Sequence, residues 1–418
     1  MAKNKTLGNT IMLYIMTFAK MAFPLITLPY LTRVLSVDGY AVVAYVKSAM
    51  VYMQILIDFG FGLSAVKEIA LVVDNKEKIS KVLGTTMMAK FLLAGIGFII
   101  IASATIAVPI LRENWLYTLL AYISIAMSVF IPDFLFRGIE KMHVVTIRFV
   151  VARGISTLLT VFAIKNDSMI LLIPCLDMIG TMVAAIWSWF EVKKLNIKPI
   201  FTEVSNALQS LKVSFVYFLS DASTTVFGAL NTLLIGIYLS KTDISFWSVA
   251  MQLITAVQAL YSPINQGIYP HMVREKNIRF VLKIFSFLFP VVIAGTVFSF
   301  VAGEWIITVV SGEKYRDAVV VFRQLLPLLI ISFPTMLFGW PCLGAINKQK
   351  QVTFSTITAA VVQIIILVLM IMFDKFTLLN VALARIISEI CLCSIRVFFC
   401  VKHRGEFTIV PKAIRKEN

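Results

Sequence analysis

Residues 11–70 read IMLYIMTFAKMAFPLITLPYLTRVLSVDGYAVVAYVKSAMVYMQILIDFGFGLSAVKEIA, and this stretch decides the fold. It holds two apolar runs, about 11–34 and 40–65, which are joined by the short turn at 36–39. A helix needs roughly 20 apolar residues to cross a bilayer, so each run is long enough to span one. Both runs also contain charged residues, which are rare in membrane helices and by default indicate function.

The composition of the whole chain is also that of a membrane protein. Of its 418 residues, 59% are hydrophobic and 14% are charged, whereas soluble domains contain about 25% charged residues. The 5 cysteines lie in apolar runs, and an odd number of them there argues against a disulfide framework. The first apolar run is too long for a cleaved signal peptide, so we expect it to be a retained first helix.

Hydropathy predicts an all-α polytopic membrane protein with twelve spans. Their approximate bounds are 9–34, 39–65, 80–107, 115–137, 143–164, 168–190, 210–239, 245–270, 280–303, 317–346, 351–373 and 377–401. The longest connection, about 191–209, separates two sets of six spans. We therefore predict an N-terminal lobe at 1–198 and a C-terminal lobe at 199–418, the latter with a short basic tail.

The distribution of basic residues predicts the orientation of the chain. Loops on the N-terminal side of the membrane hold most of the loop Lys and Arg, including those near 76–81, 137–148 and 274–283. The positive-inside rule then places both termini in the cytoplasm. Most of the net charge of +16 is explained in this way, and the chain carries no nucleic-acid-binding motif, so we expect no nucleic-acid partner.

A weak internal repeat supports the division into halves. The turn at 35–38 (LSVD) recurs at 239–243 (LSKTD), and each is followed by an apolar run. Halves with an even number of spans enter the membrane from the same side and are related by an axis along its normal. In transporters of this type, substrate sites tend to lie between the halves near the midplane.

Six basic residues lie too deep in the predicted spans for their side chains to reach the interface by default. They are Lys20, Lys47, Lys90, Arg153, Arg323 and Arg385. Each would cost about 2.5–3.5 kcal/mol in lipid, so they should face counter-charges or a wet cavity. A cation surplus suits an anionic ligand, and we interpret the six as substrate-binding residues. The alternatives are that these residues form internal ion pairs only, or that the predicted helix ends are wrong by a few residues.

Lys212 and Arg396 are nearer the helix ends, where their side chains can reach the interface, and we assign them structural roles.

Acidic residues inside the spans have two possible roles. Asp58, Asp177, Asp221 and Glu389 are candidates for coupling transport to a proton or sodium gradient, since burial raises the pKa of a carboxyl group. They are equally explained as counter-ions for the deep basic residues. Arg385 and Glu389 are four residues apart and can pair on one helical face.

Signatures of enzymes and metal sites are not found in the sequence. His143, His271 and His403 are scattered, no P-loop occurs, and no Ser, His and Asp residues form a recognisable triad. We therefore predict no catalytic residue, no metal site and no cofactor, and we expect a transporter rather than an enzyme.

Four motifs carry a family resemblance. They are LPYLTRVL at 28–35, DFGFGLSAVKEIA at 58–70, PDFLFRGIEKM at 132–142 and GAINKQK at 344–350. In these motifs, and in the number and order of spans, the chain resembles the Wzx O-antigen flippases. These form part of the polysaccharide transporter branch of the MATE-like (MOP) exporter superfamily.

The resemblance implies a fold and a function. The fold is two six-helix lobes around a V-shaped central cavity. The function is movement of an undecaprenyl-pyrophosphate-linked oligosaccharide from the cytoplasmic to the periplasmic leaflet of the bacterial inner membrane, by alternating access. The pyrophosphate would account for the cationic residues, and the prenyl tail would stay in membrane lipid. O-antigen polymerase machinery is an implied partner.

Three other functions were weighed. A drug-exporting antiporter of the same fold usually needs an acid-rich cavity, which the cationic surplus argues against. A polymerase or glycosyltransferase of the same pathway typically carries a long loop or a soluble domain, and neither is evident. A purely structural scaffold would leave the deep charges without a purpose.

Overall fold

A computed structural model describes residues 2–407, apart from the side chains of residues 2–7, 10, 220, 221, 224, 226 and 266. Within these residues the chain is helical and contains no β-strand. It divides into two compact units, Met1–Thr225 and Val226–Asn418. The predicted lobe boundary at residues 198 and 199 differs from this division and stays a prediction.

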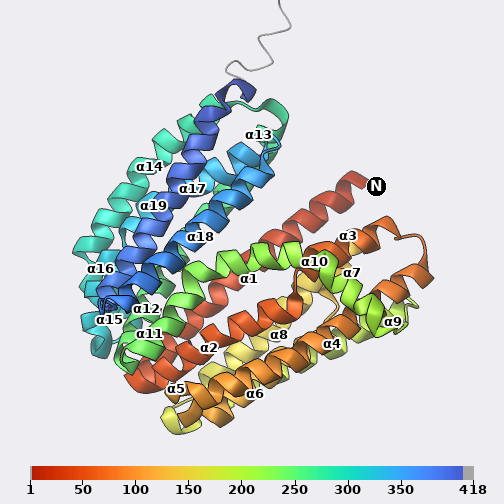
Figure 1. Ribbon diagram of the computed structural model, residues 1–418, viewed down its shortest axis with the longest axis horizontal. Helices are drawn as coiled ribbons and strands as arrows, with labels where there is room; N and C mark the ends of the chain where they lie inside the picture. Colours follow the sequence, from red (N-terminus) through yellow and green to blue (C-terminus); the bar gives the residue numbers. More distant parts are fainter. Residues whose placement is uncertain (1, 408–418) are drawn as a thin grey trace, which may run out of the picture. The chain divides into compact units, whose positions relative to one another are not determined.

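The first unit is built from ten α-helices among the described residues. They are α1 (Ala2–Val34), α2 (Val37–Asp58), α3 (Phe61–Leu71), α4 (Lys76–Ala107), α5 (Pro109–Glu113), α6 (Trp115–Ala126), α7 (Asp133–Gly138), α8 (Met142–Ala163), α9 (Leu172–Lys194) and α10 (Val204–Thr225). Helix α1 packs against α8, α8 against α9, and α2 against both α4 and α6 (Figure 1). Two short 3₁₀-helices, η1 (Met127–Phe130) and η2 (Asp167–Met169), also belong to the first unit. A buried apolar cluster that includes Phe61, Leu83 and Phe134 joins α3, α4 and α7.

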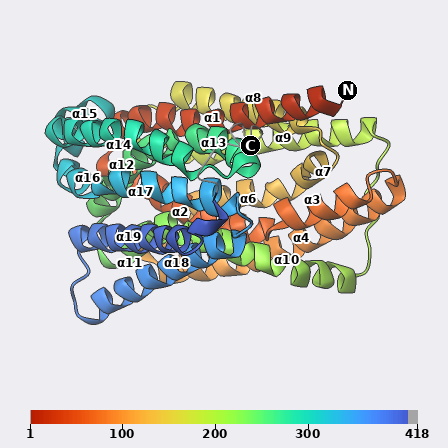
Figure 2. The same cartoon turned by 90° about the horizontal axis from the view of Figure 1, so that it is seen from above.

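The second unit contains the helices of the described residues from Val226 onward. They are the π-helix η3 (Val226–Leu230), α11 (Asn231–Tyr238), α12 (Lys241–Ala259), α13 (Tyr261–Glu275), α14 (Ile278–Val301), α15 (Gly303–Ser311), η4 (Glu313–Ala318), α16 (Val319–Leu325), α17 (Pro327–Leu337), η5 (Phe338–Gly344), α18 (Gln349–Met372), α19 (Leu378–Lys402) and η6 (Arg404–Glu406). Helices α18 and α19 lie side by side (Figure 2), and α17 packs against α19.

Eleven helical segments of the described residues are long and apolar enough to cross a membrane. They correspond to eleven of the twelve predicted spans and agree with the predicted all-helical membrane fold. The exception is the predicted seventh span, 210–239, where the chain forms α10, η3 and the short apolar α11 in succession. Every residue from Val204 to Tyr238 is helical, and η3 is a π-helical turn within this segment, so the chain is helical over nearly all of the predicted seventh span.

The predicted second span is interrupted at Phe59 and Gly60, between α2 and α3. Both residues have left-handed backbone angles, with φ of 39° and 74°. A Cβ atom at Gly60 would lie 2.5 Å from the Cβ atom of Tyr217 on α10, so any larger residue there would collide with its neighbour. Gly60 therefore serves both the backbone turn and the close packing of α10 on the end of α2.

The repeated turn begins a helix in the same way in each unit. The Ser36 hydroxyl accepts a hydrogen bond of 2.9 Å from the amide of Gly39 at the start of α2. The Ser240 hydroxyl accepts one of 3.2 Å from the amide of Asp243 at the start of α12. Each serine satisfies a backbone donor that the first turn of a helix leaves free. The sequence repeat is therefore also a repeat of local structure.

Candidate functional site

A cavity of about 570 Å³ lies within the first unit and is lined by charged side chains from six helices. These side chains are Lys20, Asp58, Lys90, Asp133, Arg137, Arg148, Arg153 and Asp177. We call this space the charged cavity. Its lining is drawn from α1, α2, α4, α7, α8 and α9, so residues far apart in the sequence meet there.

A smaller cavity of about 290 Å³ adjoins the charged cavity. The two share Gln54, Arg153, Ser156 and Asp177 in their walls. The smaller cavity adds Lys47, whose exposed side chain projects from α2. Together the two walls contain six basic side chains and three acidic ones.

Three of these basic residues are neutralised by the three acids. The Lys90 Nζ lies 2.7 Å from a carboxylate oxygen of Asp58. The Arg153 guanidinium lies 2.6 Å from Asp177, and the Arg148 guanidinium pairs with Asp133. Each pair joins two different helices, so the pairs also hold the helices of the first unit together.

Hydrogen bonds from neutral side chains complete two of these pairs. The Ser156 hydroxyl donates to the Asp177 carboxylate at 2.6 Å, and the Gln54 amide donates to Asp58 at 2.7 Å. An ionised carboxylate is stabilised by such donors. The carboxylates of Asp58 and Asp177 are therefore oriented by two donors each, one charged and one neutral.

The other three basic residues, Lys20, Lys47 and Arg137, form no ion pair within the described part of the chain. The Lys20 Nζ lies 5.7 Å from the centre of the Phe149 ring. The Arg137 Nε is buried and has no hydrogen-bond partner among the described residues. A buried guanidinium nitrogen without an acceptor is unfavourable. Lys20, Lys47 and Arg137 together give the two cavities an excess of positive charge.

Some of these residues are predicted from the sequence and others are not. Lys20, Lys47, Lys90 and Arg153 are predicted deep basic residues, and the structure brings all four to the two adjoining cavities with Asp58 and Asp177. Whether they bind substrate stays a prediction.

The predicted loop positions of Arg137 and Arg148 are wrong. Both residues lie in helices, α7 and α8, and line the charged cavity. Arg137 lies one residue before the end of α7, and Arg148 lies within α8 and inside the predicted span 143–164, so its position in that span outweighs its assignment to a loop. The motif at 132–142, which contains Arg137 beside Asp133, was the signal that could have identified this site.

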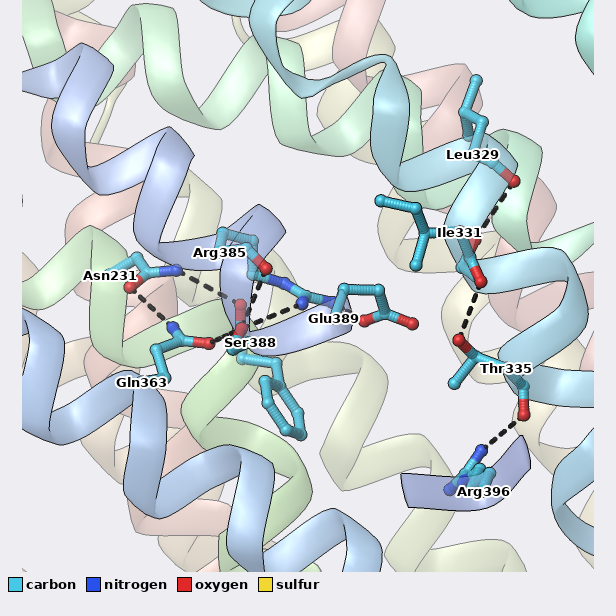
Figure 3. A network of polar contacts seen from close by, with 11 residues as sticks. Asn231, Leu329, Ile331, Thr335, Gln363, Arg385, Ser388, Glu389 and Arg396 are labelled. Carbon is cyan, nitrogen blue, oxygen red and sulfur yellow. Dashed lines mark hydrogen bonds and ion pairs between the residues drawn. The ribbon is translucent and has the colours of Figure 1, made fainter. Parts of the chain in front are cut away.

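Arg385 and Glu389 lie in the second unit, within a buried polar network on α19 (Figure 3). The Arg385 guanidinium lies 2.8 Å from the Glu389 carboxylate, which confirms the pairing predicted from their spacing. It also lies 4.9 Å from the centre of the Phe227 ring. The network extends from Ser388, which donates to Gln363 at 2.8 Å.

Two other arginines of the second unit donate hydrogen bonds to backbone carbonyls near the ends of helices. The Arg323 Nε donates to the carbonyl of Phe300 at 2.9 Å, near the end of α14. Arg396 donates to the carbonyl of Thr335 at 2.8 Å, where α17 gives way to the π-helix η5 (Figure 3). The second contact agrees with the structural role predicted for Arg396. Substrate contacts of Arg323 and Arg385, and ion coupling by Glu389, stay predictions, and the side chain of Asp221 lies outside the described residues.

Comparison with known proteins identifies relatives over nearly the whole chain. Residues 6–276 match the family described as polysaccharide biosynthesis protein. A candidate O-antigen transporter of Shigella dysenteriae is 27% identical over 367 residues, which cover 85% of this chain and 91% of the relative. A candidate O-antigen transporter of Escherichia coli strain K12 is 24% identical over 398 residues, which cover 94% and 95%.

Solved structures show the same fold. An inward-facing multidrug resistance MATE family transporter of the MOP superfamily has a TM-score of 0.69, covers 95% of this chain and 98% of its own, and is 13% identical. A MOP superfamily transporter from Pyrococcus furiosus, with a binding pocket described as having reverse polarity, has a TM-score of 0.59 at 13% identity and covers 94% and 95%. These likenesses confirm the predicted MOP-type fold class.

Proposed function

Because the chain belongs to the polysaccharide biosynthesis protein family, we propose that it is a flippase for lipid-linked O-antigen repeat units. The substrate is an oligosaccharide on undecaprenyl pyrophosphate, which passes from the cytoplasmic to the periplasmic leaflet of the inner membrane. The names of the two relatives support a transporter of this kind. O-antigen polymerase machinery would then act on the translocated units.

The observation that carries this proposal is the group of three basic residues without acidic partners around the two cavities, Lys20, Lys47 and Arg137. A pyrophosphate needs several cationic donors at once, and arginine and lysine supply them in complementary geometries. The excess of positive charge is unfavourable for a cationic drug. It therefore favours an anionic lipid over the substrates of a multidrug antiporter.

Transport follows from alternating access of two lobes, for which we retain the predicted division at residues 198 and 199. We propose that the pyrophosphate enters the charged cavity from the cytoplasmic leaflet while the prenyl tail stays in lipid. Lys90 and Arg153 are already paired with acids in the structure. They would contribute to substrate binding by exchanging an acidic partner for a phosphate oxygen.

That exchange suggests how an ion gradient drives the cycle. A phosphate that draws Lys90 or Arg153 away leaves Asp58 or Asp177 without its cation, and an unpaired carboxylate in such a cavity takes up a proton or a sodium ion more readily. In proteoliposomes with an imposed gradient, Asp58→Asn and Asp177→Asn should therefore weaken the dependence of transport on the gradient. Unchanged dependence in both variants would contradict the coupling.

The substrate proposal is tested by complementation of a strain that lacks the transporter. Lys20→Glu, Lys47→Glu and Arg137→Glu should each lower surface O-antigen by at least about tenfold, since a charge-assisted hydrogen bond contributes about 1.5–3 kcal/mol. Undecaprenyl-linked repeat units should accumulate, and protein levels should be unchanged. Lys212→Glu is the matched control, because Lys212 lies on α10 outside both cavity walls. Full activity of all three cavity variants would contradict the proposal.

A further inference from the structure

A third cavity, of about 500 Å³, lies between α3, α4 and α10 of the first unit. These three helices pack against one another, and they are labelled in Figure 1. The wall on α10 includes Asn206, Gln209 and Ser210, which have the i, i+3, i+4 spacing of one helical face. This face therefore presents two amides and a hydroxyl to the same space.

The walls on α3 and α4 are polar in the same way. Helix α3 contributes Ser64, Lys67 and Glu68, and α4 contributes Thr85 and Thr86. Both helices belong to segments that are long and apolar enough to cross the membrane. Ser64, Thr85 and Thr86 lie inside predicted spans, where polar groups are unfavourable against lipid and should meet water or a polar ligand, whereas Lys67 and Glu68 follow the end of the predicted second span. We call this space the hydroxyl–amide cavity.

The cavity has a buried end and an open end. Thr86 and Ser214 are each only 1% exposed and form the inner end, whereas Lys67, Glu68 and Asn206 are exposed. The Ser214 hydroxyl is already hydrogen-bonded to that of Ser64 at 2.7 Å. A ligand could therefore enter at the exposed residues and be enclosed by the helices at its far end.

Most of the lining groups remain free for a ligand. Within the described part of the chain, the side chains of Asn206, Gln209 and Ser210 make no hydrogen bond, and Lys67 and Glu68 make no ion pair. The charges of Lys67 and Glu68 are opposite, so the cavity carries no net charge from its walls. It thus differs from the charged cavity, in which three cations have no acidic partner.

We propose that the hydroxyl–amide cavity binds the saccharide part of the lipid-linked substrate. Amide and hydroxyl groups both donate and accept hydrogen bonds, and so do the hydroxyl groups of a sugar. A phosphate would instead require cationic donors in excess. This inference rests on the proposed function, and it assigns the two ends of one ligand to two separate cavities.

The position of the cavity fits a ligand with a charged head and attached sugars. Thr86 in the hydroxyl–amide cavity and Lys90 in the charged cavity both project from α4 and are four residues apart. One helical turn separates them, which is about 6 Å along the helix axis. The inner end of the hydroxyl–amide cavity and the Lys90 side of the charged cavity therefore lie one turn apart on α4, and a ligand that occupies both cavities would pass this turn.

The test compares two lipids binding to the full-length protein in nanodiscs. One is undecaprenyl pyrophosphate without sugar, and the other is the repeat-unit lipid extracted from a producing strain that lacks the transporter. Asn206→Leu/Gln209→Leu should bind the repeat-unit lipid about five- to tenfold more weakly, because at least one hydrogen bond to sugar is lost. Its affinity for the bare lipid should stay within about twofold of wild type.

Ser205→Leu/Lys212→Leu is the matched control, because both residues are on α10 and neither lines this cavity. It should bind both lipids like the wild type. Unchanged binding of the repeat-unit lipid by Asn206→Leu/Gln209→Leu would overturn the saccharide site, and so would equal weakening of both lipids. Failure of the wild type to bind undecaprenyl pyrophosphate would instead count against the proposed function.

Discussion

At the scale of single residues, the deep charges of this protein fall into two groups. Lys90 and Arg153 have acidic partners on other helices, and Arg385 has one on its own helix. Lys20 and Lys47 have no such partner among the described residues and face cavities instead. The distinction matters because a paired charge stabilises the fold only while its partner is present, whereas an unpaired one is available to a ligand.

The Arg385–Glu389 pair allows a test of structural against functional roles. Arg385→Met leaves Glu389 as an unpaired carboxylate that is 5% exposed, so we expect a loss of about 3–5 kcal/mol in stability. Arg385→Met/Glu389→Leu removes both charges and should recover most of that loss. Thermal unfolding of the detergent-purified protein measures both effects.

Complementation then distinguishes the two roles of Arg385. A stable double variant that restores surface O-antigen indicates that the pair is structural. A stable double variant without transport would support the predicted substrate contact of Arg385 or coupling by Glu389.

At the scale of elements, the segment that precedes α10 is held tightly against α4. The amide of Ile200 donates to the carbonyl of Ser80 at 3.0 Å, and the hydroxyls of Thr85 and Thr202 lie 2.8 Å apart. A Cβ atom at Gly84 would lie 2.0 Å from the carbonyl oxygen of Ile200. The long connection between the two sets of spans is therefore not a free linker at this point, because it lies directly on a helix of the first unit.

The close contact between Gly84 and the segment at Ile200 can be tested by substitution. Gly84→Ala should displace the segment at Ile200 from α4 and destabilise the protein by about 1–3 kcal/mol, as overpacking does in other proteins. Gly95→Ala on the same helix is the control, because a Cβ atom at Gly95 would meet no heavy atom within 4 Å. The control should be neutral or slightly stabilising, since alanine favours helix over glycine. Equal unfolding temperatures for the two variants would contradict this account of the segment.

At the scale of the whole molecule, the positive charge of the loops predicts the orientation. We propose that the connection around Lys76 is cytoplasmic and the connection around Lys165 is periplasmic, as the positive-inside rule implies. Both side chains are exposed. They therefore offer a matched pair of positions for labelling from outside the cell.

The topology test uses a membrane-impermeant maleimide on spheroplasts that express variants without the native cysteines. Lys165→Cys should be labelled directly, and Lys76→Cys only after the membrane is permeabilised. Each variant replaces one lysine by cysteine, so the two variants have the same net charge. The reverse labelling pattern would invert the predicted topology and place both termini outside the cytoplasm.

Much of the architecture could be predicted from sequence, because the signals involved are local. Apolar runs long enough to cross a bilayer identified eleven of the spans that the structure forms. The i, i+4 spacing of Arg385 and Glu389 predicted their pairing. The interruption at Phe59–Gly60 and the π-helical turn η3 were not predicted, because they depend on contacts with other helices or on local backbone geometry that hydropathy does not report.

From its sequence alone, this chain is predicted to be an all-helical membrane protein with more basic than acidic residues inside its spans. The side chains that remain without a partner could be identified only from the packing of the helices. The ion pairs join residues distant in the chain, such as Asp58 with Lys90 and Arg153 with Asp177, on different helices. Which helices meet depends on packing across the whole unit, and that packing leaves Lys20, Lys47 and Arg137 available for an anion.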